Sequence, residues 1–183
     1  MKNLLLATLL LLLFSNMQCD KSTTPSEPEP ELILPPITTQ GLNTIGCKID
    51  GKVWVPYSNT LASDPAMVVV VDRNNNWQFG FSGKQRKYSD VARNILELNV
   101  VKIYSDTIYL LDKYSKSGSF AAFFPNYNEV FFTTTSTNNI IKIIKFDSIN
   151  QIISGSFSFD VVDSLKIVKH KITEGRFDLR FDY

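Results

Sequence analysis

The chain of 183 residues contains few side chains that could carry catalytic or metal chemistry. His170 is the only histidine, and because Lys169 and Lys171 flank it we expect it on the surface. A zinc site takes three or four protein ligands, and Cys47 and His170 are too few to form one. None of the serines stands in the Gly-x-Ser-x-Gly sequence that presents a nucleophile on a strand-to-helix turn. The sequence therefore predicts no catalytic residues, no zinc site and no cofactor.

One short segment has the spacing of a calcium site. Asp72, Asn74 and Asn76 occupy the first, third and fifth positions of oxygen ligands in a helix-loop-helix calcium loop. That loop needs a glycine at its sixth position, whereas the residue here is Trp77. The flanking residues also have the pattern of strands. We therefore expect a hairpin loop rich in Asp and Asn, without a metal ion.

Aromatic side chains are the more suggestive group. The chain has 13 phenylalanines, 7 tyrosines and 2 tryptophans, which is more than one small core obviously requires. Aromatic rings at a surface bind sugars or partner proteins. Trp54, Trp77 and Tyr127 are therefore candidate binding residues, with packing in the core as the alternative. No pair of carboxylates stands out for glycoside hydrolysis, because that chemistry depends on their separation in space.

Cys19 stands between a short apolar run and a polar, proline-rich stretch. The apolar run from Leu4 to Phe14 follows one positive charge. Its length fits the apolar region of a secretory signal, which has about 7–15 residues, and is too short for a membrane span, which needs roughly 20. This arrangement is typical of a bacterial lipoprotein. We predict that residues 1–18 are removed and that Cys19 is lipidated, which makes the membrane a partner. The alternative is an ordinary secretory signal followed by a coincidental cysteine.

The segment 19–40 contains five of the eight prolines, with Ser, Thr and Glu filling most of the rest. Such a composition cannot bury enough apolar surface to fold. Extended at about 3.1 Å per residue, the segment would hold a domain up to roughly 60 Å from the membrane. Docking of Leu32-Ile33-Leu34 on the domain is the alternative. The predicted parts are a signal peptide over 1–18, a lipidated linker over 19–40 and a β-domain over 41–183.

Charge excludes one class of partner. Without the two lysines and four acids that precede Gly41, the domain retains 17 Lys and Arg against 14 Asp and Glu. Its one basic cluster, Lys84-Gln85-Arg86-Lys87, has the character of a solvated loop. Proteins that bind nucleic acid concentrate basic side chains in a stripe or patch. We therefore expect no nucleic-acid partner.

Apolar and polar residues alternate with a period of two through most of the domain, which predicts β-strands. Asp50-Gly51 between two such runs is the strongest short-range signal for a two-residue hairpin turn. That turn places Cys47 opposite Trp54, so that the indole covers the thiol. If Cys19 is lipidated, Cys47 has no disulfide partner, and we expect it to be a buried apolar residue.

Further strands follow the same pattern. Residues 67–71 and 77–81 form a second hairpin, and the other predicted strands are 95–104, 107–111, 119–124, 129–135, 140–146, 153–161 and 177–181, with a turn at Ser105-Asp106. The run 140–146 also fits a helical stripe, but its four isoleucines favour a strand. Residues 89–94 are a candidate short helix. The fold class is therefore all-β, with an antiparallel β-sandwich as the first choice and a lipocalin-like β-barrel as the alternative.

The last strand shows how the faces are assigned. Arg176 and Asp178 alternate with Phe177, which predicts that both lie on a solvated face and form a cross-strand ion pair, with a ligand-binding pair as the alternative. Gly155 and Gly175 are interpreted as positions where a strand bends or begins.

Both ends of the domain carry a recognisable sequence. Residues 41–56 read GLNTIGCKIDGKVWVP, and the later segments read IIKFD at 143–147, NQIISGSFSF at 150–159 and ITEGRFD at 172–178. These segments resemble a family of uncharacterised envelope lipoproteins of Bacteroidetes. The resemblance implies an envelope lipoprotein with an all-β domain, and because the family has no assigned activity it implies no catalytic residues.

These features favour a non-enzymatic lipoprotein of the cell envelope, whose β-domain has a binding or structural role with a glycan or protein as ligand. One alternative is a hydrolase that acts on envelope glycans, which requires a cleft with two acids. Another is a carrier that holds a lipophilic ligand inside a barrel. We expect the protein at the outer membrane, anchored through its lipid on the periplasmic or the surface face.

Overall fold

The computed structural model describes residues 31–58, 66–72, 76–86, 94–167 and 169–181. Every regular element within these ranges is a strand, which confirms the all-β prediction. Among these residues no helical segment has the length and apolarity that crossing a membrane requires. The candidate helix lies outside the described residues, apart from its last residue, Asn94, which begins a strand. Asn74 of the calcium-like loop also lies outside them.

The described residues contain twelve strands. The first six are β1 Thr44–Ile49, β2 Lys52–Trp54, β3 Tyr57–Ser58, β4 Ala66–Asp72, β5 Trp77–Arg86 and β6 Asn94–Val101. The last six are β7 Thr107–Leu110, β8 Phe120–Phe124, β9 Phe131–Thr133, β10 Ile140–Asp147, β11 Ile152–Val162 and β12 Lys169–Arg180. The pairings among them are antiparallel, except for a two-residue parallel contact between β3 and β5.

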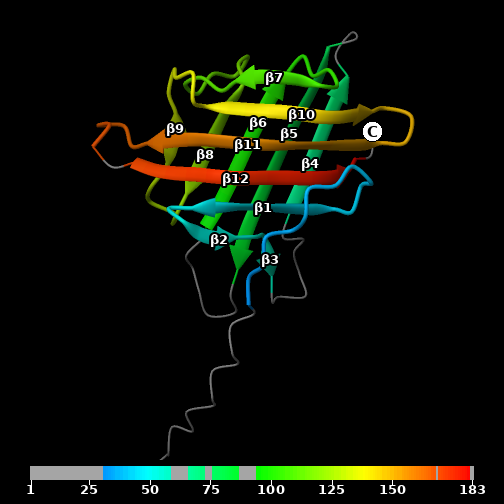
Figure 1. Cartoon of the computed structure of the whole chain (residues 1–183). Coiled ribbons are helices and arrows are strands. Elements are labelled where there is room, and N and C mark those ends of the chain that lie inside the picture. The colour runs from blue at the N-terminus through cyan, green and yellow to red at the C-terminus, as the bar shows by residue number, and fades with distance from the viewer. Residues whose placement is uncertain (1–30, 59–65, 73–75, 87–93, 168, 182–183) are drawn as a thin grey trace, which may run out of the picture. The chain divides into compact units, whose positions relative to one another are not determined.

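The strands form one curled sheet that folds into two facing layers (Figure 1). The front layer has the order β7, β10, β11, β12, β1 and β2, and the back layer has the order β9, β8, β6, β5 and β4. The layers join at β11, which pairs with β10 over residues 152–158 and with β9 at Val161 and Val162. The result is a half-barrel that shares features with both predicted architectures.

Aromatic side chains from both layers fill the space between them. Phe79 of β5 stacks on Phe177 of β12 with 5.1 Å between ring centroids. Phe81 of β5 lies 5.8 Å from Phe157 of β11. None of these four rings is more than 3% exposed. The interior of the half-barrel is therefore a packed aromatic core.

The hairpin at Asp50-Gly51 is confirmed. Both residues have positive φ angles, 50° and 81°, as a two-residue turn of this kind requires. The register pairs Cys47 with Trp54. Cys47 is completely buried, and burial raises the pKa of its thiol to about 12. The thiol is thus a buried apolar group, as expected.

Most of the remaining predicted strands are present, but their bounds and one connection differ. The basic cluster expected in a loop lies within β5 as far as Arg86, and the predicted strand 177–181 is the end of β12, which begins at Lys169. Strands β4 and β5 form the second hairpin, and the run 140–146 lies within strand β10. A turn is present at Ser105-Asp106, but the strands on either side of it belong to different layers. Strand β7 pairs with β10 of the front layer and not with β6.

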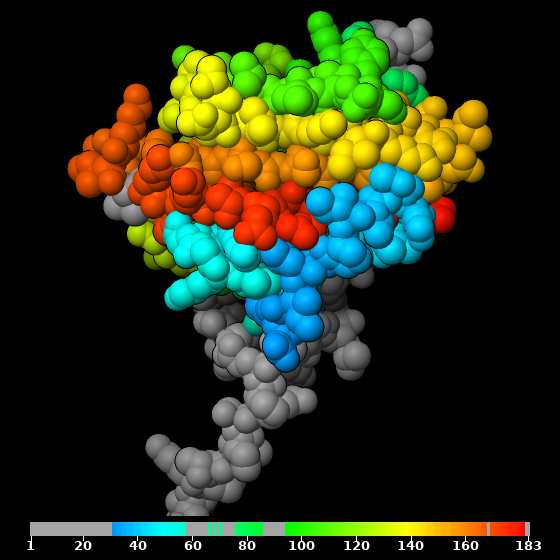
Figure 2. All heavy atoms as spheres, viewed as in Figure 1, coloured from blue at the N-terminus to red at the C-terminus, as the bar shows by residue number. Residues whose placement is uncertain are grey.

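Residues 32–42 pack on the front layer, so the compact unit begins at Leu32 and not at Gly41. We call residues 32–42 the N-terminal strap. Leu34 and Pro35 lie beside Gly46 of β1, and Arg176 of β12 donates a hydrogen bond to the carbonyl of Pro35 at 3.3 Å. In Figure 2 the strap is the blue segment that lies against the cyan and red strands. The end of the predicted linker is therefore part of the domain.

The predicted ion pair between Arg176 and Asp178 is wrong. Asp178 is 1% exposed, because the strap covers the face of β12 that strand alternation assigns to solvent. Its carboxylate accepts hydrogen bonds from Thr38 Oγ1 at 2.6 Å and from the amides of residues 40, 41 and 42 at 2.9, 2.7 and 3.3 Å. Burial opposes ionisation, but these hydrogen bonds lower the pKa of Asp178 below its ordinary 3.8. Arg176 pairs instead with Glu174, at 3.6 Å.

Candidate ligand-binding site

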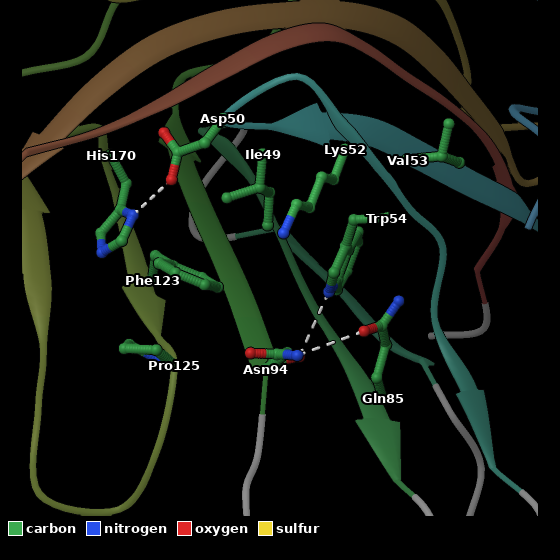
Figure 3. A pocket seen from close by; sticks show the side chains of 10 residues that line it. All are labelled: Ile49, Asp50, Lys52, Val53, Trp54, Gln85, Asn94, Phe123, Pro125 and His170. Atoms are coloured by element: carbon green, nitrogen blue, oxygen red, sulfur yellow. Dashed lines mark hydrogen bonds and ion pairs between the residues drawn. The ribbon is translucent and has the colours of Figure 1, made fainter.

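A pocket of about 340 Å³ lies where the β1–β2 hairpin approaches the ends of β5, β6 and β8 (Figure 3). We call it the mouth pocket. The hairpin contributes Ile49, Asp50, Lys52, Val53 and Trp54, the back layer contributes Gln85, Asn94, Phe123 and Pro125, and β12 contributes His170. The pocket thus combines segments that are far apart in the sequence.

A histidine–carboxylate pair forms one side of the mouth pocket. His170 Nδ1 lies 2.6 Å from Asp50 Oδ2, and Asp50 Oδ1 accepts a hydrogen bond from the amide of Lys171 at 2.8 Å. Burial raises the pKa of Asp50, but the hydrogen bonds from His170 and Lys171 outweigh it and hold the pKa below 3.8. Because an ionised carboxylate only accepts hydrogen bonds, Nδ1 of His170 carries the proton. The other ring nitrogen, Nε2, points away from Asp50 (Figure 3).

The ring of His170 is held between aromatic edges. Its centroid lies 5.2 Å from that of Phe123 and 4.6 Å from that of Phe131, both in T-shaped contacts. The side chain is 23% exposed, so the predicted surface position holds only in part. Side chains alternate along a strand, so the exposed positions of Lys169 and Lys171 turn His170 toward the other layer.

Trp54 forms the opposite side of the pocket and is 3% exposed. Its Nε1 donates a hydrogen bond to the carbonyl of Asn94 at 3.4 Å, and Asn94 Nδ2 donates to Gln85 Oε1 at 3.3 Å. Gln85 Nε2 in turn donates to the carbonyl of Val55 at 3.0 Å. This chain of hydrogen bonds links the hairpin to the back layer and fixes the position of the indole. Figure 3 shows the Lys52 amine directed into the space beside Trp54.

The structure does not bring the three candidate aromatic residues together. Trp54 lines the mouth pocket, whereas Trp77 starts β5 and packs against Phe146 at 5.3 Å. Trp54 lies beside Gly83, six residues from Trp77 along β5, which is about 20 Å at 3.3 Å per residue. Tyr127 follows β8, is 54% exposed and lines a different hollow. Cys19 lies outside the described residues.

The mouth pocket brings several polar groups together in one hollow. Its described lining contains a carboxylate, an imidazole and an amine but no hydroxyl or thiol nucleophile. Among the lining residues, Lys52 and Asn94 are exposed and His170 is partly exposed. Across the described ranges, no cluster of three or more His, Cys, Asp or Glu is suited to a metal ion.

Sequence reasoning missed the pairing of His170 with Asp50. The two residues are 120 positions apart, and no local pattern connects them. They meet because β1 pairs with β12 in a register that places Ile49 opposite Ile172, which brings the hairpin turn next to the start of β12. Only knowledge of this strand pairing could have revealed the pair.

Comparison with known proteins gives no match: no family model, no curated protein and no solved structure is significantly similar to this chain. The resemblance to Bacteroidetes envelope lipoproteins therefore stays a prediction.

Proposed function

We propose that this protein is a non-enzymatic, lipid-anchored binding protein of the cell envelope, and that its mouth pocket binds one saccharide unit of a glycan. The lining of the pocket carries this proposal, because the partly exposed side chains of Ile49, Val53 and Pro125 provide apolar contact close to the polar groups of Lys52, Asn94 and His170. A sugar ring presents apolar CH faces together with hydroxyl groups, and this lining matches both. Its volume of about 340 Å³ is near the lower end of the about 300–1,000 Å³ of small-molecule sites.

The alternative functions have less support. Glycoside hydrolysis uses two carboxyl groups on either side of the bond, whereas Asp50 is the one acid in the described lining. Both oxygens of Asp50 are also engaged by His170 and Lys171. A lipophilic carrier needs space between the layers, and rings such as Phe79, Phe81 and Phe177 occupy the described interior.

Saccharide binding is testable by saturation-transfer NMR against neutral and acidic mono- and disaccharides of bacterial envelopes. We expect Lys52→Ala to weaken binding about tenfold, because it removes a charged hydrogen-bond donor without disturbing the core. Lys116→Ala is the matched control, since Lys116 is also exposed and does not line the pocket. Absence of binding to every saccharide, or equal losses in the two variants, would contradict the proposal.

The lipid anchor is tested separately by mass spectrometry of the mature amino end. With the strap packed on the domain, only residues 20–31 separate Cys19 from it, which corresponds to roughly 37 Å at about 3.1 Å per residue. We expect residues 1–18 to be absent, acyl mass on Cys19, and release of the protein from membranes by Cys19→Ala. Retention of residues 1–18, or a mature end without acyl mass, would rule out the anchor.

A further inference from the structure

The face of the back layer that points away from the core carries two adjoining hollows of about 260 and 210 Å³. Both are lined by Glu97 of β6, and neither shares a lining residue with the mouth pocket. We call them together the outer hollow. It lies on strands β5, β6 and β8, which Figure 1 shows behind the front layer.

The strand register explains why the outer hollow is open around Glu97. The direct cross-strand neighbours of Glu97 are Ser82 on β5 and Ala122 on β8, both with small side chains. Phe120 and Phe124 stand two residues before and after Ala122 on the same face of β8. Each of these two rings lines one of the hollows. Glu97 thus lies on a floor of small residues between two aromatic side chains.

The carboxyl group of Glu97 lacks a charged partner in the part of the chain that the structure describes. Burial raises its pKa, and a hydrogen bond with Ser82 offsets this only in part. Each ion pair seen among the described residues involves other acids. A half-buried carboxylate without a cation is costly, so a bound cation would stabilise it.

Two amide side chains, those of Asn99 and Asn126, line the outer hollow with Glu97. Asn99 Nδ2 already donates to the carbonyl of Gly118 at 2.9 Å, which leaves Asn99 Oδ1 as an acceptor. Asn126 Nδ2 donates to Glu129. Glu97 is the one charged side chain in the described lining of the outer hollow, and Asn99 Oδ1 adds a second acceptor. A cationic donor therefore complements the charge of this site, which a neutral sugar hydroxyl does not.

We propose that the outer hollow binds an organic cation, an ammonium or guanidinium group, which donates hydrogen bonds to Glu97 and lies against the rings of Phe120 and Phe124. A hydrogen bond between a cationic donor and a carboxylate is roughly twice as strong as a neutral one. Aromatic faces within about 6 Å attract the same charge. The cation belongs to a free amine or to a basic amino acid, and the site is independent of saccharide binding at the mouth pocket.

The test is an NMR titration of the full mature chain with three probes. n-Butylammonium represents a free amine, Nα-acetyl-arginine amide represents a basic residue, and Nα-acetyl-citrulline amide is the neutral analogue of the arginine probe. We expect one or both cations to shift the amide signals of Ser82, Glu97 and Asn99, and citrulline to bind at least about tenfold more weakly. Glu97→Gln is expected to reduce cation binding about tenfold, and Phe124→Leu, which removes the aromatic ring but keeps an apolar side chain, about threefold.

Asp106→Asn is the matched control, because Asp106 is 83% exposed, pairs with Lys142 and lines neither hollow, so its replacement should leave cation binding unchanged. The proposal is overturned if neither cation binds below about 10 mM, if citrulline binds as tightly as arginine, or if Glu97→Gln has no effect. If the Glu97→Gln variant does not fold, the proposal is tested by comparing the arginine and citrulline probes and by the Phe124→Leu variant. Lys52→Ala should leave cation binding intact, so the failure of one site is distinguishable from the failure of the other.

Discussion

Asp178 holds the N-terminal strap through four hydrogen bonds, and every donor comes from residues 38–42. Asp178→Asn keeps the shape of the side chain but removes its charge and turns one acceptor into a donor that faces other donors. Hydrogen bonds to charged groups contribute about 1.5–3 kcal/mol each, and we expect a loss of at least that size in the free energy of unfolding. Urea denaturation measures this loss.

Ser154 provides the control on the same face of the sheet. It is the cross-strand partner of Asp178, is fully buried, and its Oγ has no hydrogen-bond partner among the described residues. Ser154→Ala should therefore change the free energy of unfolding by less than about 1 kcal/mol. If Asp178→Asn is as mild as Ser154→Ala, the carboxylate does not hold the strap.

The same residue predicts a pH dependence. The pKa of Asp178 is lower in the folded than in the unfolded chain, so its contribution to stability is fully present above the unfolded value of 3.8. It is lost as the pH falls through the folded pKa. The difference in unfolding free energy between the natural chain and Asp178→Asn should be constant above about pH 5 and should shrink below about pH 4.

At the scale of the elements, β11 and β12 interlock through two reciprocal pairs. Gly155 lies opposite Phe177, and Phe157 lies opposite Gly175. A methyl group added at Gly175 would overlap the ring of Phe157, and one added at Gly155 would overlap Phe177. These glycines, interpreted from sequence as bends, therefore make room for the aromatic core.

Gly175→Ala should lower the free energy of unfolding by about 1–3 kcal/mol, the usual cost of overpacking. Phe157→Leu should cost less in the Gly175→Ala background than in the natural chain, because the smaller side chain relieves the overlap. Gly118→Ala is the control, since its methyl group would contact only Ser115. Thermal unfolding of the four variants measures the coupling, and additive effects of the two core substitutions would argue against the interlock.

The reach of sequence reasoning also follows from the elements. The turn at Asp50-Gly51 and the pairing of Cys47 with Trp54 were predictable, because both depend on residues close together in the chain. The pairing of β7 with β10 and the double pairing of β11 were not, because alternation fixes which face a residue takes and not which strand lies beside it. The mouth pocket depends on such long-range pairings. Trp54 is therefore the only one of its lining residues that the sequence indicated as a binding residue.

At the scale of the whole molecule, the strap decides where the domain begins. A chain that starts at Glu31 keeps every donor to Asp178, whereas one that starts at Asn43 has none of them. We expect the first to melt like the mature protein and the second to melt about 5–10 °C lower, which follows from a loss of about 2–3 kcal/mol. Circular dichroism measures both, and equal melting temperatures would show that the strap is not part of the stable unit.

The all-β class of the whole molecule was predictable from the sequence, whereas the way in which its two layers join was not. A sandwich and a barrel produce the same alternation, and the difference lies in whether one strand bridges the layers. Here Val161 and Val162 of β11 do so, and nothing in their sequence marks them for that role. The position of Asp178 was misjudged for a related reason, because the segment that covers it lies about 140 residues earlier.

The burial of Cys47 has a consequence for a chain that, as proposed, works outside the cytoplasm. Oxidants and disulfide exchange attack the thiolate form of cysteine, and a pKa of about 12 leaves almost no thiolate at neutral pH. An unpaired cysteine in an oxidising compartment would otherwise crosslink neighbouring copies. In the folded protein the buried thiol of Cys47, opposite Trp54, is protected from oxidation. Only molecules in which the β1–β2 hairpin has opened expose this thiol to oxidants.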